Sequence, residues 1–234
     1  NYKDQLTQIT DALSNVTGLD YSGAGCSSCT SGVDKLTALT DAKNNTTSFA
    51  YDQTGKLTSE TDPLGKITSY GYDGKGNLIS RTSPDNKTIT YNYDLNNRLT
   101  QKTYSDSSAT AFQYDDNGNI TYAGNQYIAY NFTYDSNNRI TGITDSNART
   151  ITYTYDTNGN RTSMITPDNK TITYGYDNNN LPNQITTDLG SFTFTYDANN
   201  RRLTRTMPNG TTSAYSYDED SRLTNIQTTK SATT

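Results

Sequence analysis

The chain has 234 residues, a net charge of −5, 30% hydrophobic residues, 20 Tyr, no Trp and no His. The negative charge argues against nucleic-acid binding, and the absence of His removes the commonest general base and metal ligand. The sequence has no long apolar run and no basic-then-apolar start, so we predict neither a membrane span nor a signal peptide.

Residues 1–48 form an irregular start of a repeat array. Two segments, Gln5–Asp11 and Lys35–Asp41, have the pattern of one and the same strand. Their leucines, Leu6 and Leu36, are 30 residues apart, whereas the later copies repeat about every 21 residues. The difference predicts an insertion of about nine residues in this segment.

The insertion contains the two cysteines of the chain, Cys26 and Cys29. We expect them to form a local structural disulfide in an oxidising compartment. Free thiols, or a metal or redox site, are the alternatives. A zinc site would need two further ligands, and the chain has no His and no other Cys.

From residue 49 to 234 the pair Tyr-Asp recurs nine times, at spacings of 20 or 21 residues, as an array continuous with the first segment. An aromatic residue lies two positions before each of these Tyr. Because side chains alternate between the faces of a strand, both rings lie on one face, and we predict that they form the core of the repeats. The predicted core residues are Phe49, Tyr51, Tyr70, Tyr72, Tyr91, Tyr93, Phe112, Tyr114, Phe132, Tyr134, Tyr153, Tyr155, Tyr174, Tyr176, Phe194, Tyr196, Tyr215 and Tyr217.

The residue between the two rings is small or polar in every copy, so we expect the opposite face of the strand to be in water. In Lys87–Tyr93, Arg149–Tyr155 and Lys170–Tyr176 the apolar alternation extends back by one more position, to an Ile. This pattern is typical of a half-buried β-strand.

The fourth residue after each Tyr of the pair is Gly or Asn in eight copies and Ser221 in the ninth. Gly and Asn tolerate a positive φ, so we predict a hairpin turn with this residue in the left-handed region and the Asp bonded to the turn backbone. A second strand follows, and its less regular pattern indicates a β-bulge or a second buried edge. A second turn, as in Asp62–Gly65, then returns the chain. Each repeat is therefore one hairpin.

Two of the turns, Asp115–Asn119 and Asp156–Asn160, look like calcium-binding loops. Each lacks the closing bidentate Glu, and the turn already explains its residues. We therefore interpret both as turns, and we predict no cofactor, no metal site and no catalytic residue.

The string Tyr51-Asp-Gln-Thr-Gly-Lys-Leu-Thr58, followed by Asp62-Pro-Leu-Gly65, resembles the YD-repeat or Rhs-repeat family. Rhs toxins, insecticidal toxin shells and teneurin-like β-shell proteins belong to this family. The resemblance covers about residues 30–234. It implies an all-β fold of tandem β-hairpin repeats, in which a spiralling, coiled antiparallel sheet forms a shell, tube or solenoid.

These observations favour a structural, non-enzymatic module of a secreted or cell-surface protein that builds an extracellular β-shell, tube or fibre. The expected partners are other copies or neighbouring repeats of the same protein. One alternative is an adhesin or glycan-binding module, because Tyr and Asn arrays can stack on sugars and hydrogen-bond them, although a core role explains the rings more simply. A second alternative is the cocoon segment of a polymorphic toxin whose toxin domain is absent here.

Overall fold

The computed structural model describes residues 5–21 and 35–230, and these contain 21 β-strands and no helix. The all-β fold class and the tandem hairpins predicted from the sequence are confirmed. No helix in the described residues could cross a membrane. Cys26 and Cys29, the disulfide candidates, lie outside the described residues. The chain divides into two compact units, Asn1–Phe112 and Gln113–Thr234, which are described separately.

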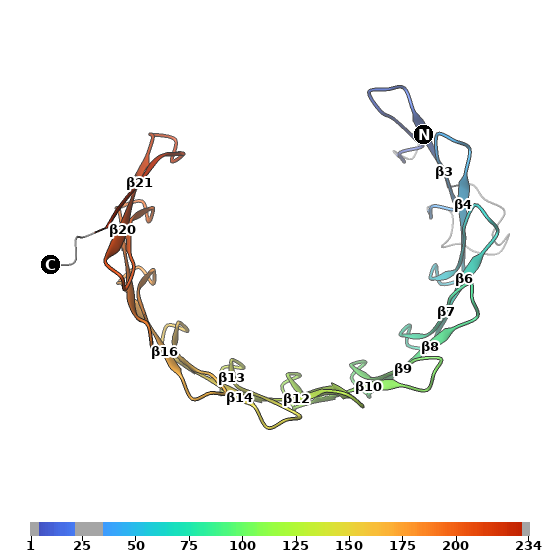
Figure 1. Ribbon diagram of the computed structural model, residues 1–234. Coiled ribbons are helices and arrows are strands. Elements are labelled where there is room, and N and C mark those ends of the chain that lie inside the picture. Colours follow the sequence, from blue (N-terminus) through green and yellow to red (C-terminus); the bar gives the residue numbers. More distant parts are fainter. Residues whose placement is uncertain (1–4, 22–34, 231–234) are drawn as a thin grey trace. The chain divides into compact units, whose positions relative to one another are not determined.

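In the first unit each strand pairs antiparallel with the next strand in the sequence. Figure 1 shows these strands, in blue to green, following one another along a curved ribbon. The strands are β1 (Gln8–Thr10), β2 (Val16–Asp20), β3 (Ala38–Thr40), β4 (Thr46–Tyr51), β5 (Leu57–Thr61), β6 (Ile67–Tyr72), β7 (Leu78–Thr82), β8 (Thr88–Tyr93), β9 (Leu99–Thr103) and β10 (Ala109–Tyr114), within which the division falls.

The second unit has the same order of consecutive antiparallel pairs. Its strands, yellow-green to red in Figure 1, also form a curved ribbon. They are β11 (Ile120–Asn125), β12 (Ala129–Tyr134), β13 (Ile140–Asp145), β14 (Thr150–Tyr155), β15 (Arg161–Ile165), β16 (Thr171–Tyr176), β17 (Pro182–Thr187), β18 (Gly190–Tyr196), β19 (Arg202–Thr206), β20 (Thr211–Tyr217) and β21 (Leu223–Lys230).

The nine Tyr-Asp turns share one backbone geometry. The residue four positions after the Tyr has a positive φ in every copy, from 60° at Asn180 to 94° at Gly76, and Ser221 has 64°. In the first of these turns the Gly55 amide donates to the Asp52 carbonyl at 3.0 Å. The left-handed turn position predicted from Gly and Asn is therefore confirmed, and Ser221 adopts it as well.

A β-bulge follows the Tyr-Asp turn. In the hairpin of β4 and β5, Tyr51 pairs with Leu57 and Ala50 pairs with Ser59, so Thr58 is left without a cross-strand partner. The same shift occurs in seven other hairpins. The bulge that the irregular second strands indicated is confirmed, and it adds to the local twist of each hairpin.

The second turn accounts for the two spacings of 20 residues. In a repeat of 21 residues this turn spans five residues, as in Asp62–Lys66, where the outer amide and carbonyl bond at 2.9 Å. In the two shorter repeats it spans four, in Asn125–Ile128 and Thr187–Gly190. The repeats of 20 residues are therefore one residue shorter in the second turn, and their Tyr-Asp turn is unchanged.

Nine Tyr-Asp pairs predict about 18 strands. The described residues contain 21 because β1, β2 and β3 precede the first pair and form hairpins without it. The sequence boundary between 1–48 and 49–234 falls inside β4, whereas the division into units falls at Phe112. The division into an irregular start, residues 1–48, and a repeat array, residues 49–234, therefore remains a prediction.

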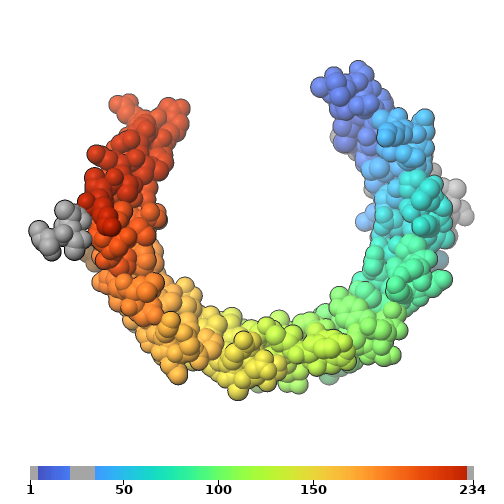
Figure 2. All heavy atoms as spheres, viewed as in Figure 1, coloured from blue at the N-terminus to red at the C-terminus, as the bar shows by residue number. Residues whose placement is uncertain are grey.

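Each unit is a single sheet without an enclosed core. Among the described residues no hydrophobic side chain is buried, and the buried polar ones are Asp145 and Ser213. The chain exposes 15439 Å², whereas two separate compact proteins of half its mass would together expose about 12,600 Å². Figure 2 shows each unit as a narrow band of atoms. The stability of a unit therefore rests on strand pairing and on contacts between neighbouring side chains of one face.

Candidate functional site

The paired rings lie on one face of the sheet in each unit, which we call the aromatic face. All 18 predicted core residues are half-buried, and the residue between the two rings is exposed in every copy except where it is Gly71 or Gly175. None of these 18 side chains is fully buried. Their assignment as the repeat core stays a prediction.

The Tyr of each pair joins its repeat to the preceding one. In eight copies its hydroxyl donates to the backbone carbonyl of the residue that opens the preceding second strand, or to the equivalent Leu36, 14 or 15 residues earlier, at 2.7 to 3.0 Å. The donors are Tyr51, Tyr72, Tyr93, Tyr134, Tyr155, Tyr176, Tyr196 and Tyr217. This carbonyl lies beside the bulge, where regular ladder bonding is interrupted.

Sequence reasoning missed this series of hydroxyl bonds, although a signal for it was present. The first ring of a pair is Phe in four copies, whereas the second ring is Tyr in all nine. Only the second position needs a hydroxyl. Burial raises the pKa of the Tyr51, Tyr93 and Tyr134 hydroxyls, so these groups remain protonated donors at neutral pH.

The Asp of each pair is used by its own turn. In all nine copies one carboxylate oxygen accepts the amide of the residue four positions later. The second carboxylate oxygen of Asp94 accepts a hydrogen bond from Arg98 Nε at 2.6 Å, and that of Asp73 accepts one from Asn77 Nδ2 at 2.9 Å. The amide of Arg98 lowers the pKa of Asp94, and the Asn77 side chain lowers that of Asp73. The predicted bond from the Asp to the turn backbone is confirmed.

Asn side chains connect successive Tyr-Asp turns along one edge of each unit. Asn77 donates to Asn97 at 3.0 Å in the first unit. Asn119 donates to Asn138 at 2.7 Å, and Asn160 donates to Asn180 at 2.8 Å, in the second. In each of these bonds the acceptor is the left-handed Asn of its turn, so this residue also joins its turn to the preceding one.

Arginine side chains insert between rings in the second unit. The Arg161 guanidinium lies 5.5 Å from the ring centre of Tyr153 and 4.7 Å from that of Tyr174. Arg202 lies in the same way between Phe194 and Tyr215, at 5.3 and 5.9 Å. Both open a second strand at the position that holds Leu or Ile in most copies. Each cation–π contact contributes about 0.5–1 kcal/mol at a partly exposed site.

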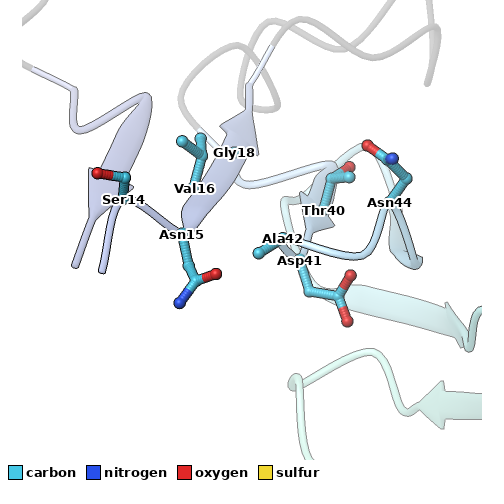
Figure 3. Close-up of a pocket in the computed structure, with 8 residues that line it drawn as sticks. All are labelled: Ser14, Asn15, Val16, Gly18, Thr40, Asp41, Ala42 and Asn44. Atoms are coloured by element: carbon cyan, nitrogen blue, oxygen red, sulfur yellow. The ribbon is translucent and has the colours of Figure 1, made fainter. Parts of the chain in front are cut away.

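The first unit has an open cavity of about 340 Å³ between the turns that connect β1 to β2 and β3 to β4. Figure 3 shows Asn15 and Asp41 projecting from these two turns. The Asp41 carboxylate accepts the amides of Lys43 and Asn45, and the Asn45 side chain lowers its pKa. The charged group of this cavity is therefore already bonded within its own turn.

The second unit has a larger cavity, of about 410 Å³, on the aromatic face beside the second turns. We call it the Tyr130 cavity. It is lined by Tyr130, Ile143, Asp145, Arg149, Ile151, Pro167 and Asp168. Tyr130 lies four positions before the Tyr of its pair, and no sequence pattern singled it out.

The described residues contain no group of three or more acidic, His or Cys side chains suited to a metal ion. The two loops that resemble calcium sites form hairpin turns. In each, the Asp115 or Asp156 carboxylate accepts both the amide and the side-chain nitrogen of the Asn four positions later.

Repeated hairpins, a Tyr bonded back to the previous repeat and an Asp-closed turn together define an array of YD-type structural repeats. The chain belongs to the teneurin YD-shell family, whose profile matches residues 87–234. The RHS repeat profile matches residues 31–67 and 51–88. The expected YD/Rhs relationship is thereby confirmed. No curated protein matches the chain significantly.

Solved Tc toxin assemblies have a similar fold. The Tc holotoxin pore of Photorhabdus luminescens matches with a TM-score of 0.53 and 17% identity, over 93% of this chain and 14% of that one. The TcdB2-TccC3-Cdc42 crystal structure matches with a TM-score of 0.52 and 17% identity, over 94% of this chain and 15% of that one. The chain thus spans about a seventh of the length of these structures, and the likeness concerns the fold alone.

Proposed function

We propose that the chain is a wall segment of a secreted or cell-surface YD-repeat protein, with a structural rather than a catalytic role. The series of Tyr hydroxyl bonds carries this proposal. It ties each repeat to the one before through a backbone carbonyl that every repeat supplies, so the bonds serve to extend an array. The carboxylates that recur in the repeats are engaged in their own turns and offer no convergent set of acids and bases.

Neighbouring repeats of the same protein, or further copies of it, are the proposed partners. Since no hydrophobic side chain is buried in residues 5–21 and 35–230, much of the surface of the sheet is open to such contacts. The titles of the similar Tc structures name complexes of several proteins, which supports a place in a larger assembly. Enclosure of a toxin or other cargo is an extension of this proposal.

The test is electron microscopy of the native protein that carries this chain, combined with protease treatment of intact cells. We expect a hollow particle or tube with walls about one sheet thick, roughly 10 Å, and cleavage of the protein on intact cells or its recovery from the medium. A solid globular particle would contradict the wall role. Protection from protease in intact cells, with none in the medium, would contradict the location.

An adhesive role is the second candidate. The Tyr130 cavity favours it, because this cavity combines an exposed ring with polar groups that the turns do not fully use. A wall segment and an adhesive surface are compatible functions of one sheet.

A further inference from the structure

The Tyr130 cavity has an apolar floor and one exposed aromatic wall. Ile143 and Ile151 face each other as cross-strand partners of β13 and β14. Tyr130 stands beside them on β12 and is 38% exposed. Pro167, from the turn between β15 and β16, lines it too. A volume of about 410 Å³ lies within the range of roughly 300–1,000 Å³ typical of small-ligand sites.

The charged groups at the rim of the cavity can form further hydrogen bonds with a ligand. Arg149 directs Nε and Nη2 to one oxygen of Asp145, at 2.7 and 2.6 Å, while its side chain stays 62% exposed. Asp145 is 8% exposed, so the ion pair fixes the guanidinium in place at the cavity. The Asp168 side chain is 60% exposed, accepts a hydrogen bond from the Thr166 hydroxyl and lies 3.5 Å from the Lys170 ammonium. A carboxylate has about four acceptor positions, which leaves room for a ligand.

This set of groups matches a molecule that has hydroxyl groups along one side and C–H groups along the other. A guanidinium only donates and a carboxylate only accepts, whereas a hydroxyl does both. The Tyr ring and the Ile pair suit an apolar ring face. An anion would meet two carboxylates, and a cation would meet Arg149. We propose that the Tyr130 cavity binds a neutral hexopyranose unit of a glycan.

The site is peculiar to one repeat and does not follow from the repeat pattern. At the position of Tyr130 the other eight copies have Thr, Ile, Phe or Ser, in Thr47, Thr68, Ile89, Thr110, Ile151, Ile172, Phe192 and Ser213. Arg149 is also the single Arg among the residues that close the second turns. The proposal therefore holds for one place in the second unit, and it does not depend on the wall role proposed above.

The direct test is NMR titration of the isotope-labelled chain with the methyl glycosides of glucose, galactose, mannose and N-acetylglucosamine. We expect at least one of them to bind saturably, with a Kd on the order of 1 mM, and to shift the signals of Tyr130, Ile143 and Ile151. If none of the four gives a saturable shift up to about 50 mM, or if the shifts map elsewhere, the proposal is wrong.

Variants with matched controls separate the site from a general surface effect. Tyr130→Ala should weaken binding at least about tenfold, whereas Tyr130→Phe keeps the ring and should retain most of it. Tyr127→Ala is the control for the loss of a tyrosine, because Tyr127 is 82% exposed and lies outside the cavity. Binding that survives Tyr130→Ala unchanged overturns the proposal.

Asp168 gives a second, independent test with an internal control. Its turn, Thr166–Asn169, has the same Pro-Asp-Asn sequence as Ser83–Asn86 in the first unit, where Asp85 lies far from the cavity in the chain. Asp168→Asn should weaken binding several-fold and Asp85→Asn should not, although each removes the same turn carboxylate. Equal effects of the two variants would contradict the site. Both are exposed turn substitutions, so this test stands even if Tyr130→Ala does not fold.

Discussion

The aromatic faces of the two units differ in the residues that flank the rings. In the first unit the partners of Phe49, Tyr70 and Tyr91 across the hairpin are the charged residues Glu60, Arg81 and Lys102. In the second unit the partners of Phe132, Tyr153, Tyr174 and Tyr215 are the apolar residues Ile143, Met164, Ile185 and Ile226, and Phe194, opposite Arg205, is the exception. The hairpin backbone is the same in both units.

The difference continues onto the next strand. In the second unit Ile143, Met164 and Ile185 each pair with a further apolar residue, Ile151, Ile172 and Phe192. In the first unit Glu60 and Lys102 pair with Thr68 and Thr110, whereas Arg81 pairs with the apolar Ile89, as in the second unit. The turn and bulge geometry thus sets the fold of each repeat, while the cross-strand partners of the rings decide how hydrophobic the aromatic face is.

The largest expected effect comes from giving the second unit the chemistry of the first. The double variant Met164→Lys, Ile185→Lys removes two half-buried apolar side chains, and we expect the free energy of unfolding to fall by about 2 kcal/mol. Hydrogen exchange should accelerate in β14 to β18 and stay unchanged in β4 to β9. Thr173→Lys, on the opposite face, is the control and should have little effect. If hydrogen exchange accelerated equally in both units, a local role of these residues would be contradicted.

The Tyr hydroxyl bonds should matter equally in the two units. Tyr93→Phe and Tyr155→Phe each remove a bond of 2.8 or 2.7 Å to a backbone carbonyl, and we expect each to lower the free energy of unfolding by about 1 kcal/mol. Urea denaturation measures the change. The controls are Tyr91→Phe and Tyr153→Phe, at the first ring position, which tolerates Phe in other copies. Losses as large in the controls would mean that the ring, and not the hydroxyl bond, is responsible.

The reverse exchange in the first unit should have a smaller effect of opposite sign. Arg81→Ile with Lys102→Ile replaces two charged side chains beside rings, and we expect a gain of up to about 1 kcal/mol in urea denaturation. The gain is reduced because Lys102 loses its contact over the Tyr104 ring at 4.9 Å. Lys66→Ile, at an exposed turn, should bring no gain. A net loss would show that the charged side chains themselves stabilise the first unit.

The smallest effect separates two matching turns by their response to salt. The Lys87 ammonium, 2.8 Å away, together with the Ser83 hydroxyl, lowers the pKa of Asp85 to about 2, whereas the pKa of Asp168 is lowered first by the Thr166 hydroxyl, with Lys170 at 3.5 Å. Added salt screens ion pairs, so it should raise the pKa of Asp85 more than that of Asp168 in an NMR titration.

The pH dependence has the same sign at both of these turns. The folded pKa of each carboxyl lies below the ordinary value of 3.8, so its contribution to stability is present above that value and is lost as the pH falls through the folded pKa. A contribution that instead grew on acidification would contradict the assignment of these bonds.

Much of the repeat could be predicted because it depends on residues close together in the sequence. Two rings two positions apart share a face of a strand, and an Asp followed three positions later by Gly or Asn closes a turn. The positive φ at Asn97 and Gly118 and the carboxylate bonds of Asp94 and Asp115 follow from such local chemistry. The constant Tyr in the pair was visible too, but its bonding partner was not.

The sequence by itself determined the hairpin period, the side of the strand that carries the rings, and the left-handed residue of each turn, because each of these depends on spacing within one repeat. The tertiary structure alone decided which carbonyl each Tyr hydroxyl reaches, which turn absorbs the shorter repeats, and that Tyr130, Arg149 and Asp168 line one cavity. These features depend on the register between strands, and a one-residue bulge changes that register without leaving a clear mark in the sequence.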